Sequence, residues 1–287
     1  MPRPWIEFVQ SQRLPRLVGD LGLFERPVAT RVMSIDPDDG SASLLIVLDD
    51  GQVLPVVDAS RDEEMLVTVG ALRSGNGDWD LDRMQYRCRA AGEPQRPPLT
   101  ASGPTIVLLF IGSVRSDSVG GEASAPAVDL VRAPWQSTFT PGLTPGAARK
   151  DLRIDPHDGS QTWILGTLPM RFGTRAEWHP VVEEMVLLSG VLTGPLGTMH
   201  PGAYFWRPPH EPHGPFGSET GTVLFFRTVG GPLETTFSDH EEVAGAREVP
   251  PVIPEDVLAG LDPSWTPTRG PWERFAARDV RHQEVAA

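Results

Sequence analysis

Carboxylate and imidazole side chains are closely spaced in the run EWHPVVEEMVLLSG, residues 177–190. Within it, Glu177, His179 and Glu183 are separated by two and then four positions. Residues at even spacing on a β-strand point to the same side, so these three side chains would share one face. A returning strand could place His213 opposite them. The pattern is typical of a mononuclear metal site inside a β-barrel, and it is the strongest chemical signal in the sequence.

The first half of the chain contains a degenerate copy of the second half. Three pairs of segments match in the same order, at offsets of 118 to 120 residues: 35–41 with 154–160, 63–72 with 183–192, and 86–97 with 204–215. A match that keeps both order and offset indicates two copies of one fold.

The two copies differ at the positions that could bind a metal. The aligned pairs are Glu177 with Val57, His179 with Ala59, Glu183 with Glu63, and His213 with Gln95. Histidines that only supported the fold would be needed in both copies. The contrast therefore favours a functional role for the histidines of the second copy.

The composition is that of a globular protein with two domains. A chain of 287 residues can hold two domains of about 120 to 140 residues each. Short apolar runs, with 29 glycines and 30 prolines, predict many short strands joined by turns. Small and polar residues at 113–133 predict the connection between the domains, and 254–261 could form a short helix. We expect an all-β protein with few short helices.

Charge and residue usage disfavour several classes of function. The net charge is −13 without a basic stripe, so nucleic acid is not an expected partner. The single lysine, Lys150, disfavours Schiff-base chemistry, and the single cysteine, Cys88, excludes an internal disulfide framework. The sequence shows neither a signal-peptide pattern nor an apolar stretch of the length of a membrane helix. We expect a cytoplasmic protein without a membrane partner.

Residues 177–190 resemble the first sequence motif of the cupin superfamily, which has the form G-x5-H-x-H-x3-E-x6-G. His179, Glu183 and Gly190 keep the spacing of its second histidine, its glutamate and its final glycine. Glu177 stands where the family has its first histidine.

A later segment resembles the second cupin motif, G-x5-P-x-G-x2-H. Gly202, Pro208 and His213 fit this motif, and His210 replaces its second glycine. The Glu-Glu doublet at 183–184 and the run RP-x4-H-G-P are similar to the anti-sigma-factor-related (ChrR-like) cupins, which are mostly of unknown function.

The resemblance covers both halves and implies a bicupin, that is, two tandem antiparallel jelly-roll β-barrels. We expect a degenerate cupin domain without metal ligands at residues 1–120 and a metal-binding cupin domain at 134–250. A C-terminal extension would occupy 251–287. The assembly expected for the whole chain is a homodimer.

For the second domain the resemblance implies His179, Glu183 and His213 as metal ligands. Two histidines and one carboxylate are the set associated with non-haem Fe(II) oxygenases, so Fe(II) is the expected ion. Zinc, manganese, nickel and copper also tolerate these ligands. Glu177 is either a fourth ligand or a proton acceptor. His210 is a further ligand, an outer hydrogen-bond donor or a residue at the rim.

Residues near the ligands suggest a small aromatic or carboxylated substrate. The candidates for binding it are Arg175, Trp178, Tyr204 and Arg227. Arg207 recurs as Arg89 in the first copy, so we expect it to be structural.

Three functions remain open on this evidence. The first is an Fe(II)-dependent oxygenase, dioxygenase-like, acting on a small organic molecule, with Glu177 as the catalytic residue. The second is a metal-dependent isomerase or hydrolase. The third is a binding or sensor protein without catalytic activity. The cupin fold by itself does not decide between these.

Overall fold

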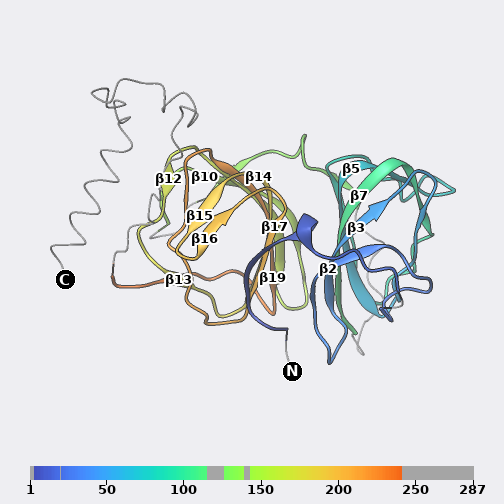
Figure 1. Ribbon diagram of the computed structural model, residues 1–287, viewed down its shortest axis with the longest axis horizontal. Helices are drawn as coiled ribbons and strands as arrows, with labels where there is room; N and C mark the ends of the chain where they lie inside the picture. Colours follow the sequence, from blue (N-terminus) through green and yellow to red (C-terminus); the bar gives the residue numbers. More distant parts are fainter. Residues whose placement is uncertain (1–2, 20, 115–125, 139–142, 241–287) are drawn as a thin grey trace, which may run out of the picture.

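The computed structural model describes residues 3–19, 21–114, 126–138 and 143–240. In these residues the chain forms β-strands and one 3-10 turn, η1 (Ser11–Arg13). Figure 1 shows the strands arranged in two barrels that lie side by side. The predicted extension at 251–287, with its helix at 254–261, lies outside the described residues.

The first barrel is built on a seven-stranded antiparallel sheet. Its strands, in spatial order, are β2 (Thr30–Ile35), β3 (Ala42–Leu48), β7 (Leu99–Val114), β5 (Arg61–Arg73), β6 (Gln85–Arg89) and β8 (Val128–Asp129), with β4 (Val53–Leu54) paired to β7.

The second barrel has a matching seven-stranded sheet and two smaller ones. The large sheet runs β1 (Ile6–Gln10), β17 (Ala203–Arg207), β14 (Val182–Gly190), β19 (Thr222–Val229), β11 (Gln161–Thr167), β10 (Ala147–Ile154) and β9 (Gln136–Ser137). The smaller sheets are β12 (Arg171–Phe172), β18 (Gly217–Ser218), β15 (Leu192–Gly194) and β16 (Gly197–Met199), and the pair β13 (Glu177–Trp178) with β20 (Thr236–Phe237).

Strand register confirms that the two barrels are copies of one fold. Glu63 of β5 faces Arg89 of β6, and Glu183 of β14 faces Arg207 of β17. The prediction of an all-β protein made of two tandem jelly-roll barrels is therefore correct.

A glycine at the same point of each barrel permits a close approach of two backbones. Gly190 has φ +85°, and a Cβ added there would lie 1.9 Å from the carbonyl oxygen of Gly221. Gly70 has φ +73°, and its added Cβ would lie 2.3 Å from the carbonyl oxygen of Pro104. No other residue fits either position, because any side chain would collide with the neighbouring backbone.

The edge strand beside β17 comes from a distant part of the sequence, and β8 takes the equivalent place beside β6. β1 precedes the first barrel along the chain but pairs with β17 of the second, with Ile6 opposite Trp206 and Val9 opposite Tyr204. β8 lies after the first barrel and pairs with β6, the equivalent of β17. The predicted domain limits of 1–120 and 134–250 therefore differ from the grouping of strands into sheets. As limits of domains they stay a prediction.

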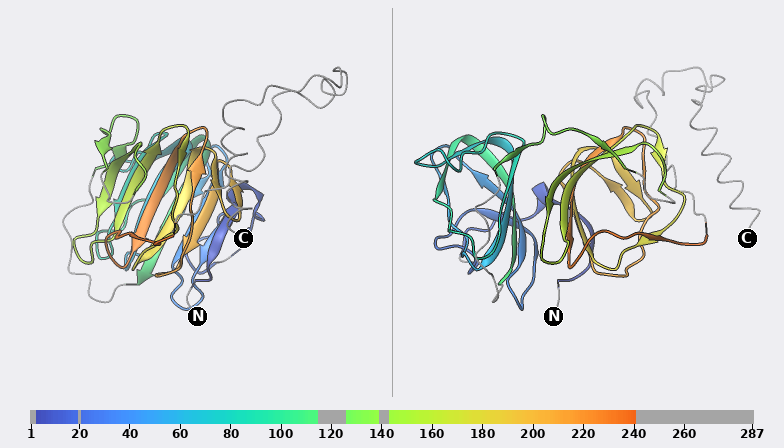
Figure 2. Two further views of the ribbon diagram at one scale, coloured as in Figure 1. Left: turned by 90° about the vertical axis from the view of Figure 1, so that its left-hand side faces the viewer. Right: turned by 180° about the vertical axis from the view of Figure 1, so that it is seen from behind.

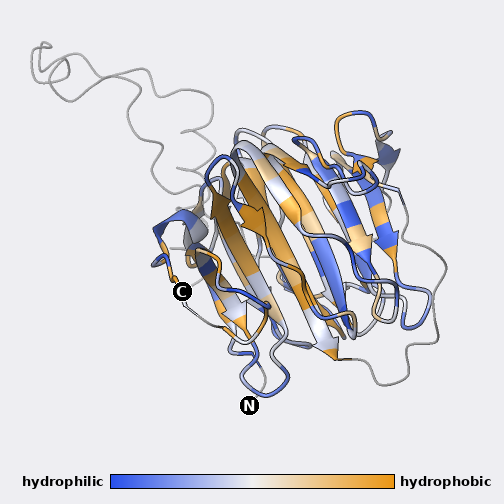
Figure 3. Cartoon of the chain, turned by 90° about the vertical axis from the view of Figure 1, so that its right-hand side faces the viewer, coloured by the Kyte–Doolittle hydropathy of each residue, from blue (hydrophilic) through white to orange (hydrophobic). Residues whose placement is uncertain are grey.

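Apolar residues form three clusters, one inside each barrel and one between them. The first barrel encloses Leu44, Ile46, Met65 and Leu109, among others, and the second encloses Met185, Leu187, Phe205 and Phe226. The third cluster contains residues of both large sheets, including Leu66, Phe110, Trp206 and Phe225. Figure 2 shows the two barrels packed sheet against sheet, and Figure 3 shows apolar residues concentrated along central strands.

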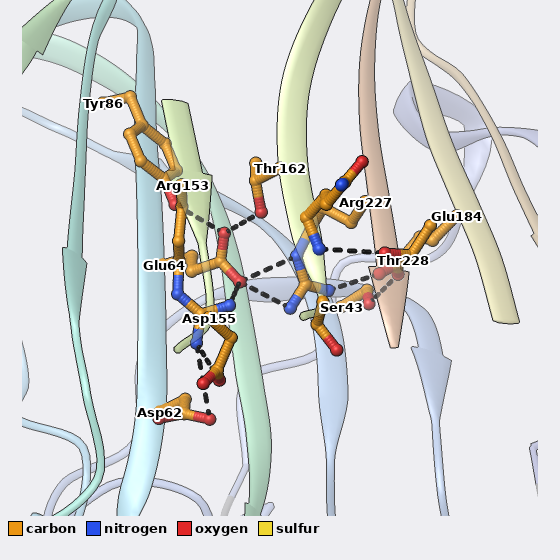
Figure 4. A network of polar contacts seen from close by, with 12 residues as sticks. Ser43, Asp62, Glu64, Tyr86, Arg153, Asp155, Thr162, Glu184, Arg227 and Thr228 are labelled. Carbon is orange, nitrogen blue, oxygen red and sulfur yellow. Dashed lines mark hydrogen bonds and ion pairs between the residues drawn. The ribbon is translucent and has the colours of Figure 1, made fainter. Parts of the chain in front are cut away.

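A buried polar network also joins the barrels (Figure 4). Glu64 accepts hydrogen bonds of 2.6 Å from the hydroxyl of Tyr86 in its own barrel and 2.6 Å from Thr162 in the other. Glu184 repeats this arrangement, accepting from Tyr204, at 2.7 Å, and from Ser43 of the other barrel.

One arginine connects the two glutamates of this network. Arg227 donates to Glu64 Oε1 through Nε at 3.1 Å and through Nη2 at 2.8 Å, and to Glu184 through Nη1. Its guanidinium carbon lies 4.6 Å from the ring centre of Phe110. Charge and aromatic packing thus meet at the centre of the interface.

No helix in the described part of the chain has the length and apolar character needed to cross a bilayer.

Candidate metal centre

The candidate ligands come from three neighbouring segments of the second barrel. Glu177 and His213 are joined by two backbone hydrogen bonds, of 2.8 Å from Glu177 N to His213 O and 2.9 Å in the reverse direction. The amide of His210 donates to the carbonyl of His179 at 2.7 Å. The returning segment is thereby held against the first, as the sequence predicts.

The strand that carries the first three candidates is interrupted. β13 ends at Trp178 and β14 begins at Val182, so the expectation of one continuous strand through 177–190 is wrong. Pro180 lies in the break, where its missing N–H cannot donate to a ladder. His179 therefore lies in the connection between two strands.

The four candidate side chains nevertheless lie together inside the barrel. Ligand atoms of Glu177, His179 and His213 lie within 4.8 Å of one another. Glu183 reaches both imidazoles, with Oε1 3.7 Å from His179 Nε2 and Oε2 3.3 Å from His213 Nε2. Two imidazole nitrogens thus lie beside both carboxyl groups, Glu177 within the group of three and Glu183 in contact with the two imidazoles.

Backbone carbonyls fix the orientation of both imidazoles. His179 Nδ1 lies 3.0 Å from the carbonyl oxygen of Glu234, and His213 Nδ1 lies 2.9 Å from that of Glu211. Because a carbonyl only accepts, we assign the proton of each ring to Nδ1. Each Nε2 then presents a lone pair, as metal-binding histidines do.

Both Nε2 atoms are buried and have no hydrogen-bond partner among the described residues. The approach of His213 Nε2 to Glu183 is close, but it does not have the direction of a hydrogen bond. Buried polar groups are normally satisfied, so two converging lone pairs beside carboxylates fit the coordination of a cation.

The two carboxyl groups of the cluster have different proton affinities. Burial alone would raise the pKa of Glu183, but the contact with His213, the nearby imidazole of His179 and the charge of Arg207 lower it to about 2. Burial, and then the negative charge of Glu183, raise the pKa of Glu177. Burial would lower the pKa of His213, but contact with Glu183 raises it. Glu183 is thus the ionised carboxylate and Glu177 the carboxyl group that more readily holds a proton.

Arg207, expected to be structural, is a direct neighbour of the cluster. Its Nη1 donates to Glu183 Oε2 at 3.2 Å, and its guanidinium lies 3.5 Å from the ring centre of Phe205. Its Nη2 lies 3.5 Å from Oε1 of Glu7 on β1. The repeated Glu–Arg pair in both copies was a usable signal for Arg207. Nothing in the sequence indicated Glu7, because β1 comes to this barrel from a distant part of the sequence.

The equivalent point of the first barrel is filled by an arginine. Glu63 Oε1 accepts from Arg96 through Nε at 2.9 Å and Nη2 at 2.6 Å. Glu63 Oε2 lies 3.4 Å from Arg89 Nε, and all three side chains are buried. Gln95, the counterpart of His213, contacts the carbonyl of Val57 at 3.4 Å. A guanidinium thus neutralises the glutamate that the second barrel presents beside two imidazoles.

Two predicted substrate residues are not brought to the cluster. Tyr204 and Arg227 belong to the network between the barrels, where they contact Glu184. Successive residues of a strand face opposite sides, so Tyr204 points away from the side of Phe205 and Arg207. For the same reason Glu184 faces away from the side of Glu183, and it is 1% exposed because the other barrel covers it.

The remaining predicted residues lie at the periphery. Trp178 is half-buried on β13, and alternation turns it away from the side of Glu177. Arg175 and His210 are exposed. His210 has a positive φ of 64° and contributes its amide to the segment of His179, while its ring is not part of the cluster.

The model of one protein family matches part of the chain. It is described as a domain of unknown function, DUF4437, and it matches residues 122–234, which contain all four candidate ligands. No curated protein sequence matches the chain.

Several solved structures have the same fold. A proposed dioxygenase from Nostoc punctiforme superposes with a TM-score of 0.64 at 21% identity, covering 79% of this chain and 82% of that one. A mutant of Bacillus subtilis oxalate decarboxylase gives 0.52 at 10% identity, over 80% and 78% of the two chains.

A cupin 2 conserved barrel domain protein from Leptotrichia buccalis gives a TM-score of 0.52 at 13% identity, covering 79% of this chain and 97% of that one. At these identities the likeness concerns the fold. The repeated barrels, their strand register and these superpositions show that the chain has the cupin fold.

Proposed function

We propose that the second barrel binds one divalent metal ion through His179, Glu183 and His213, with Glu177 beside it. The observation that carries the proposal is the pair of buried Nε2 atoms without partners, which converge on two carboxyl groups. Mn(II) centres are described for the oxalate decarboxylase of Bacillus subtilis, which has the same fold.

We further propose that the protein is an enzyme acting on a small organic molecule, with oxygenation as the first candidate reaction and Fe(II) as its ion. A ferrous ion held by three protein ligands would supply open coordination positions for a substrate and dioxygen. A structure from Nostoc punctiforme that shares the fold is described as a proposed dioxygenase, and its description names this class of reaction.

The surrounding residues orient the metal ligands and transfer a proton. The carbonyls of Glu234 and Glu211 hold the two imidazoles, and Arg207 holds the carboxylate of Glu183. Glu177 accepts or returns a proton, because its pKa is raised by burial and by the charge of Glu183. Substitution of Glu177 by Gln keeps its size and removes its proton affinity.

The test compares metal content and turnover in wild type and Glu177→Gln. The Fe(II) protein is mixed with diketones, catechols and small carboxylates, with and without oxygen. We expect oxygen-dependent turnover that Glu177→Gln reduces by about 10²-fold or more while most of the bound metal is retained. Loss of metal in parallel with turnover would identify Glu177 as a ligand, and absence of metal from wild type would reject the site.

The raised pKa of Glu177 also favours a second candidate, a metal-dependent isomerase or hydrolase. Such reactions need a positioned proton acceptor and no dioxygen. Turnover that is equal with and without oxygen would select this candidate. Tight ligand binding without turnover would select a binding or sensor protein.

Some finer expectations stay proposals. They are the relation to the anti-sigma-factor-related cupins, the homodimer, the cytoplasmic location, and the domain limits at 1–120 and 134–250.

A further inference from the structure

Arg89, beside Glu63, and Arg207, beside Glu183, occupy equivalent positions in the two barrels but have different partners. In the first barrel, Arg89 donates to four backbone carbonyls, those of Asp58, Ala59, Arg61 and Ala90. In the second barrel, Arg207 donates to Glu183, while its buried Nε and Nη2 have no hydrogen-bond partner among the described residues. The backbone of the barrel therefore fixes Arg89 far more firmly than Arg207.

The further charged contact of Arg207 comes from outside the second half of the sequence. Its Nη2 lies 3.5 Å from Oε1 of Glu7, whose side chain is 20% exposed. Its neighbour Phe8 packs with the apolar residues inside the same barrel. Strand β1 thus contributes two side chains to the second barrel, and one of them is a carboxylate near the metal cluster.

We propose that Glu7 is a positioning residue of the metal centre, acting through Arg207 on the carboxylate of Glu183. This inference rests on the proposed metal binding by the second barrel. Arg207 has two nitrogens that could engage Glu183 as a fork, yet only Nη1 donates to it. Glu7 attracts Nη2 of Arg207 and so keeps the guanidinium from binding both carboxylate oxygens of Glu183.

The expected effect of losing Glu7 follows from competition for one carboxylate. Bidentate arginine–carboxylate pairs are strong, so a guanidinium released from Glu7 would turn toward Glu183. Glu183 Oε1, which now faces His179 at 3.7 Å, would be drawn away from the metal position. Removal of Glu7 should therefore weaken metal binding and change the geometry of the ligands.

The experiment uses the full chain and cobalt(II) as the probe. Cobalt affinity and the visible absorption of the bound ion are measured for wild type, Glu7→Gln and the control Glu25→Gln. Glu25 is exposed, so its variant has the same loss of charge without the contact. Glu7→Gln should weaken affinity by about 10- to 100-fold and alter the spectrum, and Glu25→Gln should do neither.

A double-mutant cycle tests the route through Arg207. In an Arg207→Gln chain the intermediary is gone, so adding Glu7→Gln should have little further effect on cobalt affinity. An equal loss in both backgrounds would overturn the proposal. If the Arg207→Gln chain does not fold, the cobalt spectrum of Glu7→Gln decides, because an unchanged spectrum overturns positioning and a changed one supports it.

The outcomes separate this inference from the proposed function. Wild type that binds no cobalt would overturn both the metal centre and the role of Glu7. Wild type that binds cobalt, with Glu7→Gln equal to Glu25→Gln, would overturn the role of Glu7 alone.

Discussion

Glu177 and Glu183 lie in one cluster, yet their surroundings separate their proton affinities. Glu183 lies between two imidazoles and accepts a hydrogen bond from Arg207, which together keep it ionised in spite of burial. Glu177 is half-buried and faces the charge of Glu183, so its carboxyl group binds a proton more readily. Such divergence between neighbouring carboxyl groups is how one site supplies both a ligand and a proton acceptor.

The first prediction concerns metal content. His213→Ala should remove most of the bound metal, because it deletes one of the two converging Nε2 atoms. Gln95→Ala alters the equivalent position of the first barrel and should leave the content unchanged, since that site already contains a guanidinium beside Glu63. Metal analysis of both purified variants checks this, and equal content in wild type and His213→Ala would reject the site.

Sequence alone predicted the four clustered residues but misplaced two of their supposed neighbours. Spacing located Glu177, His179 and Glu183 on one side even though Pro180 breaks the strand. Alternation puts Glu184 on the face opposite to Glu183, but it does not say what covers that face. The second barrel's outer face is covered by the first barrel, so Tyr204 and Arg227, expected to bind substrate, lie in the interface instead.

At the scale of elements, the first barrel keeps the buried glutamate of the metal site although it has no counterparts of the two histidines. β5 still carries a buried glutamate, and the segment after β6 supplies Arg96 as its cation. Pairing by guanidinium rather than by metal makes this barrel independent of an ion. The repeat predicted that Glu63 stands opposite Glu183, but it could not predict that the residue beside Gln95 would fill the site.

The second prediction tests this internal cation. Arg96→Met should destabilise the chain by about 3–5 kcal/mol, because it leaves Glu63 buried without its main partner. Arg96→Lys keeps a positive charge and should lose less. Urea unfolding measures the change, and metal content should stay at the wild-type value in both variants. A loss as large in Arg96→Lys as in Arg96→Met would show that packing, not charge, is responsible.

At the scale of the whole molecule, the two barrels are joined by a nearly symmetric set of contacts. Each buried glutamate accepts from a tyrosine of its own barrel and from a hydroxyl of the other. Arg227 breaks the symmetry, because one guanidinium serves both glutamates. Arg153 lies 3.5 Å from Glu64 and Arg3 lies 3.7 Å from Glu184, so each glutamate has a further cation, while Arg227 bridges the two.

The third prediction is a large loss of stability in Arg227→Met. The change leaves Glu64 and Glu184 short of a buried positive partner, at a cost of about 3–5 kcal/mol. Arg83 is exposed, and Arg83→Met should change stability by no more than about 0.5 kcal/mol. Urea unfolding at neutral pH compares them, and similar midpoints for the two variants would contradict a central role for Arg227.

The fourth prediction concerns acid. Burial alone would raise the pKa of Glu64, but Arg227 and Arg153 lower it to about 2. A lowered pKa means that the stabilisation is complete above the unfolded value of about 4.3 and is lost as pH falls through the folded one. Stability should therefore fall between about pH 4.5 and pH 2, by on the order of 3 kcal/mol from this group. Unfolding midpoints across this range should fall less steeply in Glu64→Gln, and identical slopes would contradict the assignment.

The pairing of β1 with β17 has a consequence for the order of events at the ribosome. β1 is synthesised well before its partner β17, which begins at residue 203. At typical rates of about 5–20 residues per second, roughly 10–40 s of translation separate the two strands. During that time Ile6, Phe8 and Val9 have no sheet to join, and the growing first barrel offers them none. The nascent chain therefore carries an unpaired apolar segment until β17 is made. In this period a chaperone or a wrong strand partner would bind it.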